Sequence, residues 1–432
     1  MPLRLAASDP DFEARFSDML AAKREVSEDV DRTVADILDD VRRRGDAAVI
    51  DYSQKFDRID LEKLGMRVSE QEIAAAKGSC DAETLKALEL ARDRIEAHHR
   101  RQKPADETYR DPIGVELGHR WTPLDSVGLY VPGGTAAYPS SVLMNAVPAK
   151  VAGVGRLAMV VPSPGGELAP LVLAAAELAG VDEVFRIGGA QAIGALAYGT
   201  ETIRPVAKIV GPGNAYVAAA KRRVFGTVGI DMIAGPSEVL VVADGTANPD
   251  WIAADLLAQA EHDVSAQSIL ITDDASLADA VEAAVERQLT TLPRKDVAGA
   301  SWRDYGAVIV VAAIDDAVPL ANRIAAEHLE IIGADEDRLA LAIRHAGAIF
   351  LGGHTPEAIG DYVGGSNHVL PTARTARFAS GLGVLDFVKR TSILRCGPEQ
   401  LKAIGPAAIA LGEAEGLAAH ARSVAIRMNP GG

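Results

Sequence analysis

The hydrophobic positions in the first hundred residues follow a helical period. Val34, Leu38 and Val41 recur every three or four positions, with Asp and Arg between them, which is the pattern of an amphipathic helix. Charged segments continue up to Pro104, a residue type that commonly stops a helix. We therefore expect residues 1–105 to form a helical N-terminal region.

Two local details belong to this helical region. Ser69 is followed three positions later by Glu72, which is typical of a capping box at the start of a helix. His98 and His99 lie in a strongly charged segment, and adjacent residues on a helix point about 100° apart. We interpret both histidines as exposed to solvent.

From about residue 106 the pattern changes to short runs of Val, Ile and Leu that alternate with Ala-rich segments. Continuous apolar runs bounded by Gly and Pro favour strands that are buried on both faces of a parallel sheet. The predicted strands are Val127–Val131, Leu157–Val161, Val184–Ile187 and Lys208–Val210. Helices between them complete βαβ units, so we expect residues 106–236 to form a doubly wound, Rossmann-like α/β domain.

A second series of the same kind follows. Its predicted strands are Glu238–Val242, Ser268–Thr272, Ala307–Val311 and Ala348–Leu351, with helices near Asp250–His262, Leu277–Leu289 and Asp315–Ala326. We expect residues 237–380 to form a second α/β domain, followed by a connector over 381–395. The Ala-rich helical segment 398–428 is too small to be stable alone, so the tail 381–432 is expected to pack on another domain or another subunit. The predicted fold class is α/β: two incomplete Rossmann-like domains with helical extensions at both ends.

Composition limits the possible classes of partner. The chain has 432 residues, of which 48% are hydrophobic, so it is long enough to bury a sizeable core. Its 44 Lys and Arg against 60 Asp and Glu give a formal charge of −16. No excess of cations is available to neutralise phosphates, which argues against nucleic acid or an anionic membrane as the main partner. No run of about 18 apolar residues occurs, so we expect no transmembrane span.

The cysteines and the first residues point to the cytoplasm. Cys80 and Cys396 are the two cysteines of the chain and lie far apart, so we expect no disulfide framework and a reducing compartment. The opening residues are followed closely by Asp9 and Asp11, a pattern that does not fit a signal peptide. Neither cysteine is close in sequence to the candidate loops described below, so we expect no catalytic thiol.

One polar pair on a predicted helix is a candidate metal site. Gln259 and His262 are three residues apart and therefore neighbours on one helix face. An amide oxygen and an imidazole nitrogen can both bind a divalent metal. Asp361, in a glycine-rich loop that also carries His368, could complete a nitrogen and oxygen site. The alternative explanation of the pair is an ordinary polar helix surface.

Glu327 and His328 form a candidate acid/base pair. The segment Asn322–Glu330 is predicted to end a helix, and a carboxylate near an imidazole can hold the pKa of the imidazole close to neutrality. The alternative is an exposed polar helix end. Glu415 and His420 lie five residues apart on the last predicted helix, about 140° around its axis, so a shared ligand requires the helix to end between them or the ligand to lie off the axis.

Three glycine-containing loops follow predicted strands. They are Gly128–Gly134, Gly188–Gln191 and Gly211–Asn214. Glycine lets the backbone approach a ligand closely, and an open α/β sheet binds ligands at the carboxyl ends of its strands. None of the loops matches the G-x-G-x-x-G dinucleotide pattern. A nucleotide site and ordinary strand–helix turns both remain as explanations.

Taken together, these stretches resemble the histidinol dehydrogenase family. The matching segments, in the family's order from residue 128 to 427, are GLYVPGG, YPSSVLMNAVPA, GGAQAIGALAYGT, VGPGNAYVAAAK, IDMIAGPSEVLVVAD, DLLAQAEHD, AAEHLEI, GDYVGGSNHVLPT and EGLAAHARSVAIR. The resemblance implies oxidation of L-histidinol to L-histidine in two NAD-linked steps at one site. It also implies a homodimer with shared active sites.

The resemblance assigns roles to particular residues. It implies a zinc site of Gln259, His262, Asp361 and His420, with His420 supplied by the other subunit. It implies that Glu327 and His328 are the acid/base pair. It implies substrate contacts from Ser237, His368 and Glu415, together with His328 and the four zinc ligands, and NAD contacts from Tyr130, Gln191 and Asn214. The first α/β domain would then bind NAD, and the second would carry the metal and catalytic residues.

Three other functions are compatible with parts of this pattern. The first is a related enzyme on the same scaffold that oxidises another amino or sulfonated alcohol. The second is a zinc hydrolase with Glu327 as base, for which the three glycine loops have no obvious use. The third is a non-catalytic metal- or nucleotide-binding protein, which the presence of both Glu327 and His328 disfavours.

Overall fold

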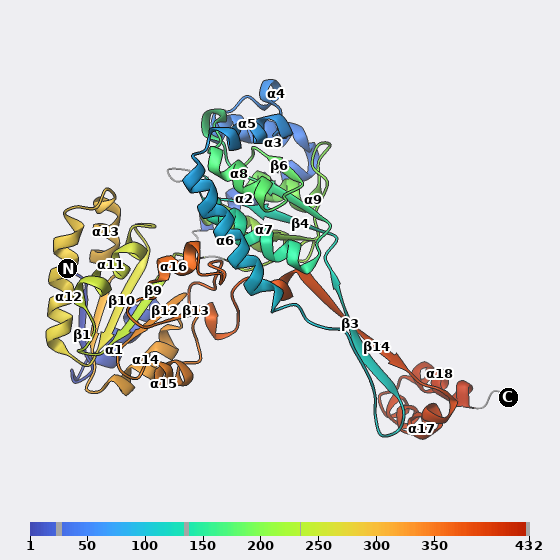
Figure 1. The fold of residues 1–432 in the computed structure, drawn as a ribbon. Coiled ribbons are helices and arrows are strands. Elements are labelled where there is room, and N and C mark those ends of the chain that lie inside the picture. Colours follow the sequence, from blue (N-terminus) through green and yellow to red (C-terminus); the bar gives the residue numbers. More distant parts are fainter. Residues whose placement is uncertain (23–27, 134–137, 234, 429–432) are drawn as a thin grey trace.

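The computed structural model describes residues 1–22, 28–133, 138–233 and 235–428. Two parallel sheets with their helices form the body of the molecule, and a long antiparallel ribbon leads from the body to a helical tail (Figure 1). No helix in these ranges is long and apolar enough to span a bilayer. Gly134 of the first glycine loop lies outside the described residues.

The first sheet has five parallel strands in the order β6-β5-β4-β7-β8. The strands are β4 (Ser126–Tyr130), β5 (Arg156–Val160), β6 (Glu183–Phe185), β7 (Lys208–Val210) and β8 (Gly229–Ile230). Its helices are α7 (Pro139–Ala152), α8 (Pro170–Leu178), α9 (Gly189–Tyr198) and α10 (Ala215–Val224). The four strands predicted here are confirmed, and β8 adds a short edge that the pattern did not predict.

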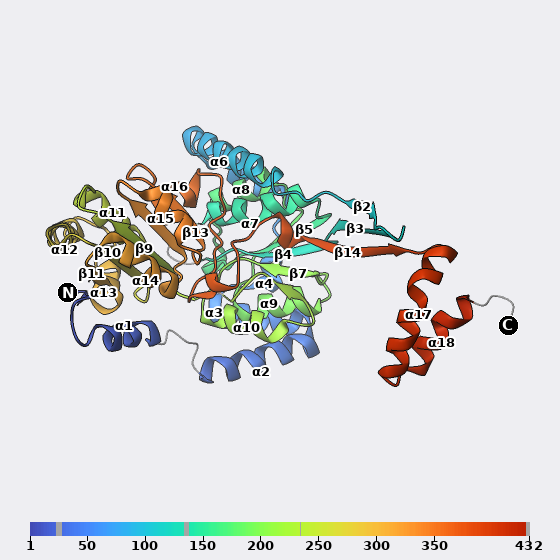
Figure 2. The ribbon, with the colours of Figure 1, turned by 90° about the horizontal axis from the view of Figure 1, so that it is seen from below.

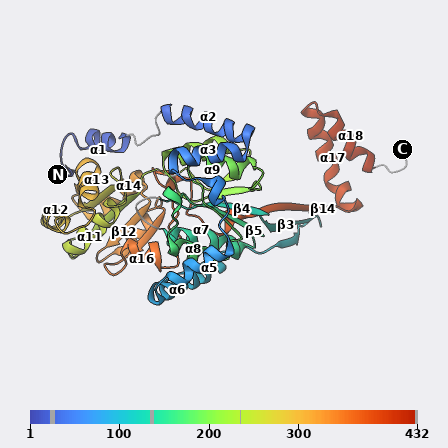
Figure 3. The same ribbon diagram turned by 90° about the horizontal axis from the view of Figure 1, so that it is seen from above.

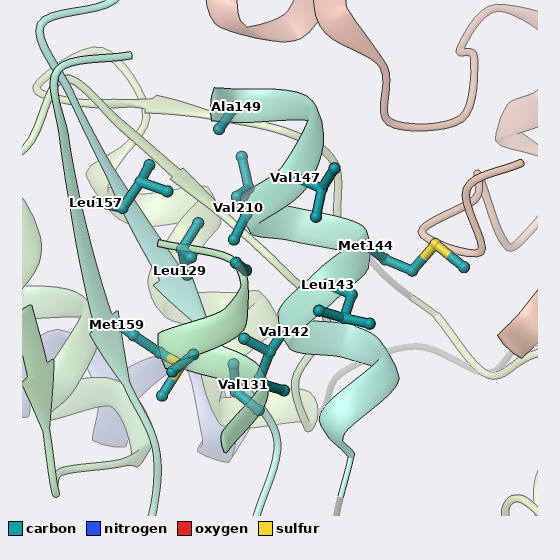
Figure 4. Packing of buried hydrophobic residues seen from close by; sticks show 14 of the residues in the cluster. Leu129, Val131, Val142, Leu143, Met144, Val147, Ala149, Leu157, Met159 and Val210 are labelled. Carbon is teal, nitrogen blue, oxygen red and sulfur yellow. The ribbon is translucent and has the colours of Figure 1, made fainter. Parts of the chain in front are cut away.

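Helix α7 covers one face of this sheet. It begins with Pro139 in its first turn and ends at Gly153 in the left-handed conformation, which suits a proline start and a glycine stop. Between them apolar residues occur all round the helix. Figure 4 shows Val142 and Val147 of α7 packed with Leu129 and Leu157 of the sheet. Burying each such side chain stabilises the fold by about 1.5–3 kcal/mol.

The N-terminal helices cover both faces of the first domain. They are α2 (Glu28–Arg44), α3 (Asp46–Asp57), α4 (Leu61–Leu64), α5 (Glu70–Ser79) and α6 (Ala82–Arg100). Figure 3 shows α2 and α3 beside α9 on one side, and α5 and α6 beside α8 and α7 on the other. The capping box of α5 is confirmed: Glu72 N donates to Ser69 Oγ at 3.2 Å, and Ser69 N donates to Glu72 Oε2 at 2.9 Å.

His99 is buried, so the expectation that it is exposed is wrong. Its exposed fraction is 0%, and its Nδ1 lies 2.7 Å from Ile95 O. His99 continues the buried face formed by Leu88, Ala91 and Ile95, which packs on α7. The charged neighbours of His99 concealed this helical spacing. His98, on the other face, is exposed as expected.

The second sheet has six parallel strands in the order β1-β11-β10-β9-β12-β13. The strands are β1 (Leu3–Ala6), β9 (Glu238–Ala243), β10 (Gln267–Thr272), β11 (Ala307–Val310), β12 (His328–Ile332) and β13 (Ala348–Leu351). Its helices are α1 (Phe12–Ala21), α11 (Pro249–Ala260), α12 (Ala275–Leu289), α13 (Lys295–Tyr305), α14 (Ala317–Ile324), α15 (Glu336–Ala342) and α16 (Glu357–Tyr362). Short 3-10 turns occur in both domains and in the connector that follows: η1 (Pro164–Gly166) in the first domain, η2 (Ile314–Asp316) and η3 (Thr375–Arg377) in the second, and η4 (Val384–Phe387) in the connector.

The start of the chain differs from the predicted helical region. Residues Leu3–Ala6 form β1, which pairs parallel to β11. Leu5 of β1 and Phe16 of α1 are buried in the core of the second domain, so the chain begins in one domain and crosses to the other. A four-residue strand is too short to show a period, which explains why the sequence pattern missed it.

The segment around His328 is also different from its prediction. Helix α14 ends at Ile324, and Ala325 adopts the left-handed conformation with φ 48° and ψ 52°. The next residues lead directly into β12, which lies between β9 and β13 and is buried along its whole length. His328 therefore begins a central strand rather than ending a helix, because burial in the sheet outweighs the helical spacing of the preceding residues.

The predicted connector contains a strand. Residues Val388–Arg395 form β14, which pairs antiparallel with β3 (Glu116–Pro123), and β3 pairs with β2 (Glu107–Arg110). Beyond the ribbon, α17 (Pro398–Ala414) and α18 (Ala418–Met428) pack against each other. Figures 1 and 2 both place these two helices away from the two sheets.

Candidate active site

A cleft of about 1120 Å³ lies between the two α/β domains. Residues of the first domain that line it include Tyr130, Gln191 and Asn214; those of the second include Ser237, His262, Glu327, His328, Asp361 and His368. The structure thus brings together most of the residues that the sequence singled out. Gln259 lies behind this lining, and Glu415 and His420 lie in the tail.

The two sheets present opposite ends to the cleft. In the first sheet, Tyr130 ends β4 and Gly211 follows β7, as expected for a parallel sheet that binds ligands at its carboxyl edge. In the second sheet, Ser237 immediately precedes β9, and His328 is the first residue of β12. These neighbouring strands are in register, with His328 opposite Val239. Their amino ends therefore hold the candidate catalytic side chains close together.

The first-domain end of the cleft contains an unsatisfied polar atom. Tyr130 Oη accepts a hydrogen bond from Gly189 N at 3.1 Å, and burial raises the pKa of Tyr130 to about 12, so the phenol stays neutral. Gln191 is 1% exposed, and its Oε1 has no hydrogen-bond partner among the described residues. A buried amide oxygen without a partner is costly, which indicates that a ligand completes this part of the cleft.

Hydrogen bonds determine which nitrogen of His328 faces the cleft. Its Nδ1 lies 3.1 Å from the carbonyl oxygen of Glu238 and 3.1 Å from Gln259 Oε1. Both neighbours are acceptors, so Nδ1 carries the hydrogen and Nε2 keeps its lone pair. Nε2 is buried, has no hydrogen-bond partner among the described residues, and lies 3.9 Å from Asp361 Oδ1. Burial lowers the pKa of His328 to about 4, so the ring is neutral near pH 7.

Glu327 is a buried carboxyl beside this imidazole. Its Oε2 accepts a hydrogen bond from Glu238 N at 3.1 Å and lies 3.9 Å from His328 Nδ1. Burial raises the pKa of Glu327 well above its usual range, although the hydrogen bond from Glu238 N opposes the shift. Glu327 and His328 therefore combine a weakly acidic carboxyl with a neutral base, a separation of roles common at catalytic sites.

The candidate metal ligands of the body lie close to this pair. Gln259 Nε2 and His262 Nδ1 are 3.0 Å apart, and Asp361 Oδ1 is 3.8 Å from His368 Nδ1. His368 Nδ1 also lies 3.0 Å from the backbone oxygen of Asp361. The described residues contain no group of three or more His, Cys, Asp and Glu side chains placed to hold a metal. A complete site in this cleft therefore needs the amide of Gln259 and at least one further ligand.

Glu415 and His420 are not brought to the cleft of their own chain. Glu415 caps the end of α17, Gly416 follows with φ 72°, and His420 lies in the first turn of α18. The helix thus ends between Glu415 and His420, which is one of the two arrangements that would let them share a ligand. Both side chains are exposed at the far end of the ribbon (Figure 1).

The sequence pattern missed one residue next to the candidate base. Glu357 Oε2 lies 3.5 Å from His328 Nδ1, and Glu357 is 1% exposed. Burial raises the pKa of Glu357 well above its usual range. Nothing in its local sequence distinguishes it from a surface glutamate, because the contact depends on how α16 packs against β12.

The comparisons with known proteins agree with this geometry. The sequence profile of the family described as histidinol dehydrogenase matches residues 20–428. Histidinol dehydrogenases of Rhodopseudomonas palustris and Brucella abortus are 71% and 70% identical over 429 residues, which is 99% of this chain and 100% of each relative. A crystal structure of histidinol dehydrogenase from Elizabethkingia anophelis matches with a TM-score of 0.95 and 36% identity, covering 99% of this chain and 98% of the other. This chain therefore belongs to the histidinol dehydrogenase family.

Proposed function

We propose that this protein oxidises L-histidinol through L-histidinal to L-histidine, with reduction of two NAD, in the last steps of histidine biosynthesis. The observation that carries the proposal is the shared cleft. It places the Tyr130, Gln191 and Asn214 end of the first domain opposite the buried Glu327 and His328 pair. Residues that bind a dinucleotide and residues that move protons would thus meet at one substrate.

His328 is the proposed base for removal of the hydroxyl proton. Its Nε2 is unprotonated and directed toward Asp361, whereas Nδ1 is held by the backbone carbonyl of Glu238. This carbonyl fixes both the ring orientation and the tautomer, so the lone pair is ready when substrate enters. A positioned base of this kind contributes roughly 10²–10⁴-fold to the rate.

Glu327 is the proposed base for the second oxidation. Once deprotonated, its carboxylate would take a proton from a water molecule that attacks the aldehyde carbon, and His328 would accept the proton of the resulting hydrate. The hydrogen bonds from Glu238 N and from Ser237 stabilise the charged form of Glu327. The raised pKa of Glu327 means that this step depends on pH.

The residues present fit a zinc ion. Gln259 Oε1, an imidazole nitrogen of His262 and a carboxylate oxygen of Asp361 are donors of the kind that zinc accepts, and the side chains of Gln259 and His262 are neighbours, with Gln259 Nε2 3.0 Å from His262 Nδ1. Zinc held there would orient the amine and imidazole of the substrate and polarise its hydroxyl oxygen. The proposed fourth ligand is His420 of a second copy of the chain.

The position of the tail supports the proposed homodimer with shared sites. Three apolar side chains of the ribbon and tail are exposed: Leu394 of β14 (68%), Leu411 (65%) and Leu417 (44%). The tail has little hydrophobic core of its own, so this exposed apolar surface lowers its stability as a separate unit. Covering these side chains against a second copy would bury them and carry Glu415 and His420 to that copy's cleft. The proposed location is the reducing cytoplasm, on the basis of the low cysteine content.

The yield of NADH tests the proposed reaction. Purified protein, zinc, NAD and a limiting amount of L-histidinol should give two NADH and one L-histidine per histidinol consumed. Other amino alcohols, tested in parallel, should react poorly. One NADH per substrate would indicate a simple alcohol dehydrogenase, and turnover of another alcohol but not of histidinol would indicate the related enzyme. Release of a hydrolysis product without NADH would support a hydrolase.

A further inference from the structure

The turn after β7 depends on a glycine. Gly211 follows Val210 with φ 109°, a conformation that residues with a Cβ rarely adopt. A Cβ at this position would collide with the carbonyl oxygen of Tyr130. Gly211 therefore lets the loop Gly211–Asn214 lie directly against the end of β4, in the wall of the cleft.

A buried ion pair holds both polar groups of this glycine. Gly211 N donates to Asp231 Oδ2 at 2.8 Å, and Lys221 Nζ donates to Gly211 O at 2.9 Å. Lys221 also pairs directly with Asp231 Oδ1. The two side chains are 2% and 1% exposed, and they come from α10 and from the residue after β8. One ion pair thus joins β7, β8 and α10 at a single backbone position.

The other end of the loop is fixed by Asn214. Asn214 Oδ1 caps α10 by accepting hydrogen bonds from Tyr216 N at 3.1 Å and Val217 N at 3.2 Å. Because the carbonyl oxygen is used by the cap, the amide hydrogens of the exposed side chain remain for a ligand in the cleft. The orientation of this amide therefore depends on the cap at one end of the loop and on Gly211 at the other.

A contribution to stability does not by itself explain why the Lys221–Asp231 ion pair is buried here. A buried ion pair costs desolvation energy that apolar residues of similar volume do not. Lys221 and Asp231 line the cleft with the loop that they hold, and their charges cancel, so the loop offers neutral donors without a net local charge. Their arrangement instead suits pre-organisation, in which a loop is ordered before its ligand arrives.

We propose that Lys221 and Asp231 are positioning residues for the dinucleotide, which hold the Gly211–Asn214 loop in the conformation that binds NAD. This inference rests on the proposed function, because it requires that the loop contacts NAD. The pair acts through the backbone of Gly211 and through Asn214. It should therefore affect the affinity for NAD and NADH more than the turnover of the saturated enzyme.

The test compares Lys221→Met, Asp231→Asn and the neutral double variant with wild-type enzyme. NADH affinity is measured by fluorescence titration, and KM for NAD, kcat at saturating NAD and Tm are measured alongside. We expect each variant to weaken NADH binding by roughly 10- to 100-fold, the scale of a slightly misplaced binding group, with kcat close to that of wild type. The double variant excludes a leftover buried charge as the cause.

Lys208→Met is the matched control. Lys208 begins the same strand, three residues before Gly211, but its Nζ donates to Asp386 O at 2.8 Å and holds neither polar group of Gly211. This variant should lower Tm but leave NADH affinity unchanged. Wild-type NADH affinity in folded Lys221 and Asp231 variants, with only Tm reduced, would overturn the inference. Asp231→Asn, which keeps the side-chain shape, decides the question if Lys221→Met does not fold. Failure of the wild-type enzyme to bind NADH would instead overturn the proposed function.

Discussion

At the residue scale, the proposed site depends on burial acting in opposite directions on two neighbouring groups. Burial raises the pKa of Glu327 well above its usual range and lowers the pKa of His328 to about 4, because it penalises the charged form of each. A carboxyl and an imidazole of ordinary pKa would instead form an ion pair near neutrality. The site thus has a free lone pair at His328 beside a carboxyl that burial makes a weaker acid.

The raised pKa of Glu327 gives the first prediction. Since only its carboxylate can accept a proton from water, kcat should increase with pH through the pKa of Glu327, above the range of an ordinary carboxyl. Glu327→Gln should lower kcat by roughly 10²–10⁴-fold and remove this dependence. A pH profile of both proteins, with pre-formed histidinal as a second substrate, provides the measurement.

Glu13→Gln is a suitable control for that experiment, because Glu13 pairs with Arg323 on the surface of the same domain. It should retain the wild-type profile. If Glu327→Gln kept the same rising limb as wild type, the limb would belong to another group and Glu327 would not be the base of the second step.

At the element scale, whether a strand can be predicted from the sequence depends on how far its side chains are buried. The strands β4, β5, β9 and β10 could be predicted because each is buried on both faces and reads as a continuous apolar run. By contrast, β14 is exposed along nearly its whole length, so its sequence carries no apolar signal. The missed β12 contains His328 and Glu330, polar residues that the sheet accepts at the site.

The residues of the candidate site also divide into those that the sequence could identify and those that it could not. Gln259 and His262 were found because they lie three residues apart in a predicted helix. The helix α11 ends at Ala260, so His262 lies in the turn that follows, and this turn brings Gln259 Nε2 within 3.0 Å of His262 Nδ1. Glu357 and the Lys221–Asp231 pair were missed because their contacts join segments that only the packing of separate elements brings together. Local periodicity does not contain that information.

The turn between α14 and β12 gives a second prediction. Ala325 is buried and left-handed, which costs about 1–2 kcal/mol for a residue with a Cβ, and a β-branched residue fits this conformation worse. Ala325→Val should lower the free energy of unfolding by about 2 kcal/mol and reduce kcat, because the turn leads directly to Glu327 and His328. Denaturant unfolding and steady-state kinetics measure the two effects.

Ala326→Val provides the comparison, because Ala326 is equally buried but has no positive φ. It should be destabilised by overpacking alone. Equal loss of stability and activity in the two variants would show that the backbone conformation of Ala325 contributes nothing.

The capping box of α5 gives a third prediction, on acid stability. Partial burial raises the pKa of Glu72, but hydrogen bonds from Ser69 and Arg186 outweigh it and lower the pKa to about 2. A lowered carboxyl pKa stabilises the fold above the unfolded value of 4.5, and this contribution is lost as pH falls toward 2. Because Glu72 is 44% exposed, solvent limits the contribution to about 1 kcal/mol.

Glu72→Gln should therefore reduce stability at pH 7 while making the remaining stability less sensitive to acid between pH 4.5 and 2. Glu70→Gln, in the first turn of the same helix, should have little effect. Denaturant unfolding measured across this pH range distinguishes them. Parallel pH curves for wild type and Glu72→Gln would contradict the assignment.

At the scale of the whole molecule, the proposed zinc site is incomplete within one chain, because its proposed ligands are divided between the cleft and the tail. His262 and Asp361, two of the proposed zinc ligands, line the cleft, while His420 and Glu415 are exposed in the tail and do not line it. In the proposed homodimer, closed two-fold symmetry would supply the missing ligand, since a tail that docks on its partner must receive the partner's tail in return. The exposed apolar residues Leu411 and Leu417 would be buried by this proposed exchange.

Complementation between two inactive variants tests this arrangement. Enzyme with His420→Asn should lose zinc and activity without unfolding, and enzyme with Glu327→Gln should be inactive with its zinc retained. Unfolding and reassembling the two together should restore about a quarter of the wild-type activity, because half of randomly formed dimers are mixed and each contains one intact site. That value holds only if each site combines the body of one chain with the tail of the other.

The pairing of His420→Asn with Glu415→Gln is the decisive control, because both changes lie in the tail. In a mixed dimer every cleft then receives one defective tail, so no intact site forms and no activity should return. If instead the cleft used its own tail, neither mixture would regain activity even though mixed dimers could be shown by mass. Recovery in the first mixture but not the second requires that residues about sixty positions apart in sequence, Asp361 and His420, meet only across two chains.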